Sequence, residues 1–142
     1  MNKLKINRFA GLDLLNRRSK AKVDNAQIVE ICLVCRASML AFKAGCGTEQ
    51  HWSSLAYCMN VAMVLAELGV MPEGLSAIEG GQDALEIVRN IGAWQLGSHA
   101  FVINSAVNIF LKQISVAKNQ QVVKAIIEVL KRNEQTRRGC RG

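Results

Sequence analysis

The stretch LAYCMNVAMVLAEL, residues 55–68, carries apolar side chains nearly all the way round a helix. A helix of this kind is typical of the centre of a protein, where neighbouring elements cover every face. The stretch is shorter than the roughly 18 apolar residues that a membrane span requires, and it contains Asn60 and Glu67. We therefore predict a central core helix over residues 48–68, with Asn60 buried and in need of hydrogen-bond partners.

Capping signals mark the ends of this helix and place another helix before it. Thr48 is a favourable N-cap, and Gly69 is typical of a glycine C-cap. Upstream, Asp24 has the spacing of a capping box with Gln27, which predicts a helix over residues 24–44. Apolar residues at steps of three and four predict its buried stripe as Ile28, Ile31 or Cys32, Cys35, Met39 and Phe42.

The third predicted helix begins near Pro72, which suits a first helical turn. Its apolar face continues across Gly80 and Gly81, and this glycine pair allows two interpretations. A break that restarts at Asp83, or a kink, is the preferred one, because each glycine inside a helix costs about 1 kcal/mol relative to alanine. A close contact with a neighbouring helix is the alternative.

Two more helices complete the predicted fold. Ser98 is a suitable cap for the fourth, and Asn119 opens the fifth, which ends near Asn133. In the fifth helix, Glu128 and Arg132 form an outward i,i+4 pair. The residues predicted to face inward there are Val123, Ile126, Ile127 and Leu130.

The sequence shows no convincing β-strand and no internal repeat. We therefore predict an all-α protein, a compact bundle of about five helices. Residues 24–133 form a single domain. Residues 1–23 form a basic arm, mobile or partly helical, and residues 134–142 form a basic, disordered tail.

Charge divides the chain into an acidic body and two basic ends. Residues 1–23 hold seven Lys or Arg and one Asp, residues 24–108 hold three basic and eight acidic residues, and residues 109–142 hold eight basic and two acidic ones. An anionic partner would interact with these basic ends. The alternative is that the basic tails only keep the chain soluble. The predicted partner-binding residues are Lys3, Lys5, Arg8, Arg17, Arg18, Lys20 and Lys22, then Arg137, Arg138 and Arg141, with Trp52 as an interface anchor or a core residue.

Cys32, Cys35, Cys46 and His51 raise the question of a metal site. On a continuous helix, Cys46 lies roughly 16 Å beyond Cys35 at about 1.5 Å per residue. Zinc holds sulfur ligands at about 2.3 Å, so we predict core cysteines and no metal or cofactor. His51 is then a polar surface residue or a capping neighbour. No residues can be given complementary catalytic roles, which predicts a protein that is not an enzyme.

Three segments carry a resemblance to known proteins: HWSSLAYCMNVAMVLAELGV (51–70), LSAIEGGQDALEIV (75–88) and FLKQISVAKNQQVVKAIIEVLKRN (110–133). They resemble a group of short helical proteins carried by proteobacterial plasmids and phages, some of them labelled Fis-like transcriptional regulators. The resemblance implies an accessory protein of a mobile element. It rests on helical patterning and includes no catalytic motif.

These observations predict a non-enzymatic binding protein that docks on a host protein or nucleoprotein complex. The most specific form of this prediction is an anti-CRISPR-like inhibitor of host defence. The alternative is a nucleic-acid-binding regulator that uses the basic termini. No secretory signal is evident and the cysteine count is odd, which predicts a reducing cytoplasm. We expect no membrane association, and the generous apolar content allows a homodimer.

Overall fold

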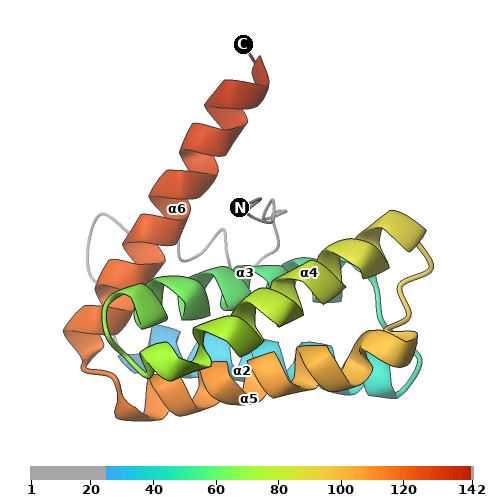
Figure 1. The fold of residues 1–142 in the computed structure, drawn as a ribbon, viewed down its shortest axis with the longest axis horizontal. Helices are drawn as coiled ribbons and strands as arrows, with labels where there is room; N and C mark the ends of the chain where they lie inside the picture. Colours follow the sequence, from blue (N-terminus) through green and yellow to red (C-terminus); the bar gives the residue numbers. More distant parts are fainter. Residues whose placement is uncertain (1–24, 142) are drawn as a thin grey trace.

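The computed structural model describes the backbone of residues 25–141 and the side chains of residues 26–137, so the predicted arm over residues 1–23 lies outside the described part. Its regular secondary structure is entirely helical, without strands, which confirms the predicted all-α fold of about five helices (Figure 1). The helices are α2 (Asn25–Lys43), α3 (Glu49–Glu67), α4 (Leu75–Ile91), α5 (Ala100–Val116) and α6 (Asn119–Arg141), and short 3₁₀ turns lie at Pro72–Gly74 and Gly97–His99. None of these helices combines the length and apolarity needed to cross a membrane.

Helix α3 lies at the centre of the bundle, as its all-round apolar sequence predicts. Every residue from Trp52 to Ala66 is buried. Helices α2, α4, α5 and α6 all contact it. The hydrophobic core therefore forms around one helix, and the other four each supply one apolar face to it.

Both predicted caps of α3 are present. The Thr48 hydroxyl accepts a hydrogen bond from the backbone N–H of His51, and the Thr48 N–H donates to His51 Nδ1 at 3.1 Å. At the other end Gly69 adopts a left-handed φ of 91°, and the Val70 N–H donates to the Leu65 carbonyl at 2.9 Å. These bonds satisfy backbone groups that a helix leaves unpaired at its ends.

The preferred break at Gly80 and Gly81 is wrong, because α4 is continuous from Leu75 to Ile91. The alternative, a close helix contact, explains the glycines. A Cβ added to Gly81 would lie 2.5 Å from the Ala106 Cβ of α5, closer than real Cβ atoms approach. Close packing of α4 on α5 thus outweighs the helix propensity that the glycine pair costs.

The predicted cap of α5 is also wrong. Ser98 lies inside the 3₁₀ turn, and α5 begins two residues later at Ala100 without a side-chain cap. Within the turn, the His99 N–H donates a hydrogen bond of 3.0 Å to the Leu96 carbonyl. This backbone bond takes the place of the predicted side-chain cap.

Buried amides connect the core helices. Asn60 is buried as predicted, and its Oδ1 accepts a hydrogen bond of 2.8 Å from Gln82 Nε2 of α4. Gln113 of α5 donates from Nε2 to the carbonyls of Ala62 and Val70, each at 3.1 Å. Because buried amides are costly without partners, these bonds favour one alignment of α4 and α5 against α3.

Helix α6 begins at Asn119 as predicted but continues to Arg141, well past the predicted end near Asn133. Its buried residues are Val122, Ala125, Ile126 and Val129. The prediction that Ile127 faces inward is wrong, since that side chain is exposed. Beyond Val129 no described side chain is buried, and the helix extends away from the bundle (Figure 1).

Basic residues account for the length of α6. Arginine is a good helix former, and cations near a helix C-terminus interact favourably with its macrodipole. Arg137 also lies 3.8 Å from Glu134, one turn before it. The predicted disordered tail is thus a helical extension.

Candidate partner-binding surface between α3 and α6

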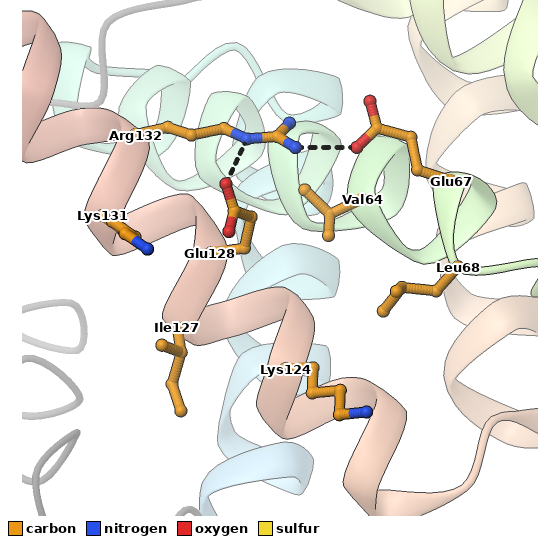
Figure 2. A pocket seen from close by; sticks show the side chains of 8 residues that line it. All are labelled: Val64, Glu67, Leu68, Lys124, Ile127, Glu128, Lys131 and Arg132. Carbon is orange, nitrogen blue, oxygen red and sulfur yellow. Dashed lines mark hydrogen bonds and ion pairs between the residues drawn. The ribbon is translucent and has the colours of Figure 1, made fainter.

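A groove of about 430 Å³ lies where α6 crosses the end of α3 (Figure 2). Its apolar surface comes from Val64 and Leu68 on the α3 side and from Ile127 on α6. Val64 is buried, whereas Leu68 and Ile127 are 41% and 43% exposed. Charged residues complete the lining: Glu67, Lys124, Glu128, Lys131 and Arg132.

Arg132 joins the two helices at one end of the groove. Its Nη2 donates to Glu67 Oε1 at 2.9 Å and its Nε to Glu128 Oε2 at 2.7 Å (Figure 2). Partial burial lowers the pKa of Arg132, but the bonds to Glu67 and Glu128 outweigh burial and leave this pKa raised. The predicted pair of Glu128 and Arg132 is confirmed, and both carboxylates are engaged by the same guanidinium.

Lys124 and Lys131 remain available for a partner. Both are exposed, and neither makes an ion pair with another described residue. They lie seven residues apart on α6, about two turns, so both ammonium groups rise from the side of the helix that borders the groove. The groove thus offers apolar contact area between two unpaired positive charges.

The end of α6 continues this positive character beyond the groove. Residues 131–141 contain five Lys or Arg and a single acidic residue, Glu134. Arg137, a predicted partner-binding residue, is exposed there. Arg138 and Arg141 belong to the same helix, but their side chains lie outside the described part. Among the described side chains, Lys124, Lys131 and Arg137 are thus the exposed basic residues that the groove and the projecting end of α6 offer.

The other predicted basic contacts belong to residues 1–23 and lie outside the described residues. They are Lys3, Lys5, Arg8, Arg17, Arg18, Lys20 and Lys22. Their part in binding stays a prediction.

Trp52 is not an exposed interface anchor. Its side chain is fully buried, and Nε1 donates to the Leu85 carbonyl of α4 at 2.7 Å. The Trp94 ring lies 6.4 Å away between centroids, and the Arg89 guanidinium carbon lies 5.5 Å from the Trp52 ring. The central position of α3 explains the correction, because α4 covers even the first turn of that helix.

Cys32, Cys35 and Cys46 do not cluster around His51. Cys35 is buried and contacts Cys58 of α3, whereas Cys46 is exposed with its thiol 3.7 Å from the Ala44 carbonyl. His51 serves as the capping residue described above. Among the side chains of residues 26–137, no group of three His, Cys, Asp or Glu is arranged to hold a metal ion.

The thiols of Cys32 and Cys58 are poor nucleophiles. The hydrogen bond with Cys35, together with burial, raises the pKa of Cys58 well above its usual value. Burial also raises the pKa of Cys32. Because the thiolate is the reactive form, the raised pKa makes each of these two thiols a weaker nucleophile near neutral pH.

The groove itself was not predicted from the sequence. Lys124 and Lys131 share one side of α6, a pattern that the seven-residue spacing makes visible in the sequence. Glu67, however, is 65 residues from Arg132, and no local pattern links them.

Comparisons of the chain with known protein families, curated proteins and solved structures found no significant match.

Proposed function

We propose that this chain is a non-enzymatic binding protein that uses the α3/α6 groove and the projecting end of α6 to dock on an acidic surface of a macromolecular partner. The observation that carries the proposal is the extension of α6. Its last eleven residues bury no described side chain against the bundle. This end continues a helix that is already formed, so a partner that packs against it meets a preformed, basic contact element.

The groove favours a protein partner over a nucleic acid. Of the described side chains in this region, Lys124, Lys131 and Arg137 would meet phosphates, and the apolar area of Leu68 and Ile127 would stay unused. An acidic protein segment with apolar side chains uses both features. Apolar contact then supplies affinity, and the lysines supply orientation and a faster association rate.

The resemblance to accessory proteins of plasmids and phages supports a host complex as the partner. A small protein of a mobile element gains by blocking host machinery, and inhibition of a host defence complex is the most specific form of this proposal. If the chain inhibits such a complex, it should protect phage in a strain with active CRISPR defence.

A nucleic-acid-binding regulator is the second candidate, favoured by the same concentration of basic residues in α6. It predicts that the purified protein alone retains DNA. If about six phosphate contacts form, the logarithm of the affinity falls with the logarithm of salt concentration at a slope of about −5.

The experiment that separates these candidates is affinity capture from host lysate with and without nuclease. Recovery of one protein complex that survives nuclease supports the docking proposal. Loss of every recovered protein after nuclease supports the regulator instead. Recovery of no partner in either condition contradicts both.

The captured partner is then tested against two double variants. Lys124→Glu with Lys131→Glu reverses the charge of the groove. Lys43→Glu with Lys112→Glu makes the same change in net charge at exposed positions on α2 and α5. If the Lys124→Glu/Lys131→Glu variant loses capture and the control variant does not, the partner contacts the groove.

A further inference from the structure

Helix α2 has apolar residues on two opposite faces, and the described residues cover only one of them. The inner face, which includes Ile31, Cys35 and Met39, is buried against the bundle. On the opposite side Val29, Leu33 and Leu40 are 56%, 61% and 64% exposed. The exposed alanines Ala26 and Ala37 lie in the same row.

The spacing of the exposed row is that of a helix–helix seam. Its members follow one another at steps of three, four, four and three residues: Ala26, Val29, Leu33, Ala37 and Leu40. Such steps keep all five on one stripe about 21 Å long. Ala26 and Val29 recur as Ala37 and Leu40 after eleven residues, a repeat close to the natural helical period, which lets two nearly straight helices remain in contact.

The charged residues beside the stripe indicate which partner can pack against it. Only three charged residues occur in α2, and two of them border the stripe. Glu30 lies about 60° to one side of its centre and Arg36 about 60° to the other, at 100° per residue. Neither makes an ion pair within the described residues.

We infer that a second copy of this chain covers the stripe, with the two α2 helices parallel about a two-fold axis. In that arrangement the Glu30 side of each helix faces the Arg36 side of the other, so two ion pairs form. Glu30 and Arg36 are six residues apart, about 9 Å along the axis, a distance that the two long side chains bridge. An antiparallel pair would instead place Glu30 near Glu30 and Arg36 near Arg36, which is unfavourable.

This self-association is independent of the proposed function. The stripe is on α2, whereas the proposed docking surface is on α3 and α6. A dimer would present two copies of that docking surface to a partner, which raises the avidity without any new contact.

Sedimentation equilibrium over a wide range of protein concentration tests the inference. The wild-type chain is expected to reach the mass of a dimer at high concentration, and Leu33→Glu is expected to remain a monomer. Phe101→Glu, at an 80% exposed position on α5, is the matched control and retains the dimer. A wild-type chain that is a monomer at every concentration overturns the inference.

A charge exchange tests the parallel arrangement. Glu30→Arg and Arg36→Glu are each expected to weaken the dimer, and the double variant to restore it. Six residues apart on one helix, these side chains do not pair with each other, so rescue requires a second chain. Failure of the double variant to recover the dimer contradicts the parallel pairing.

A photo-crosslinking amino acid at position 33 identifies the occupant directly. Crosslinks to residues 29–40 of a second copy, at dimer mass, are expected. Crosslinks from position 33 to residues 1–24 of the same chain, at monomer mass, assign the stripe to the N-terminal residues and overturn the inference.

Discussion

Arg132 of α6 donates a hydrogen bond of 2.9 Å to Glu67 at the end of α3, although 65 residues separate the two in the sequence. This contact, with the neighbouring bond to Glu128, holds α6 across the end of the central helix. It also leaves Lys124 and Lys131 as the cations of the groove without a carboxylate partner among the described residues. One surface ion-pair network thus sets both the position of α6 and the charge offered to a partner.

The network is expected to orient α6 more than it stabilises the fold. Both carboxylates and Arg132 are partly exposed, with side-chain exposure of 29% for Arg132 and 41% for Glu67. Solvent screening limits such a pair to less than about 1 kcal/mol. Arg132→Gln should therefore lower the free energy of unfolding by that amount in urea titrations, and high salt should reduce the difference. A loss above about 3 kcal/mol would show instead that the pair is a structural part of the core.

The adjacent glycines of α4 should respond in opposite ways to alanine. Gly81→Ala forces a methyl group against Ala106 and should lower stability by about 1 to 3 kcal/mol, because the core is already tightly packed. Gly80→Ala places its methyl 3.5 Å from Val102, an ordinary contact, and should raise stability by up to about 1 kcal/mol. Thermal or urea unfolding of the two variants checks this. Equal effects of both substitutions would contradict the close approach of α4 and α5.

The burial of Trp52 predicts a fluorescence difference between the two tryptophans of the chain. In Trp94→Phe, the remaining Trp52 should emit at short wavelength and resist quenching by acrylamide, because it is fully buried. Trp52→Phe should leave the longer-wavelength, more easily quenched emission of the partly exposed Trp94. It should also lower stability by about 1 to 3 kcal/mol, since the Leu85 carbonyl loses its donor. Emission typical of an indole in water from Trp52 would exclude a central α3.

Alkaline pH should destabilise the fold in part through Tyr57. Full burial raises the pKa of this phenol far above its usual value, so the folded chain keeps a proton that the unfolded chain releases near pH 10. The unfolded state then binds fewer protons, and stability falls as the pH rises through about 10. The decline approaches about 1.4 kcal/mol per pH unit for this one group.

Tyr57→Phe isolates this contribution. The difference in unfolding free energy between the variant and the wild type should be constant below about pH 9 and shift in favour of the variant above pH 10. A difference that does not change with pH would mean that the hydroxyl is exposed to solvent.

The central part of the fold was predictable because its signals are local. The all-round apolarity of residues 55–68 identified the core helix, and the Thr48 and Gly69 caps marked its ends. Predicting that Asn60 is buried with a partner needed only the cost of burying an amide. The partner itself, Gln82, is 22 residues away and was not predictable from local patterns.

The errors arose where tertiary packing or helix continuation decided the outcome. The break at Gly81 followed from helix propensity, but Ala106 of α5 requires a residue without a Cβ there. Ile127 was placed inward because it continues an apolar pattern, whereas the crossing of α6 over α3 buries Ala125 and Val129 instead. The basic end of α6 was interpreted as a tail because it lacks an apolar stripe, yet helix propensity and the macrodipole suffice to continue the helix.

The affinity of the captured partner for the Lys124→Glu/Lys131→Glu variant is the most direct test of the central claim. Titration calorimetry, with circular dichroism to check that the variants are helical, compares it with the wild type and with the Lys43→Glu/Lys112→Glu control. Reversing the groove charges is expected to weaken binding by about tenfold or more, equivalent to about 1.4 kcal/mol, while the control stays close to the wild type. Equal affinity of the groove variant and the wild type would contradict binding through the α3/α6 surface.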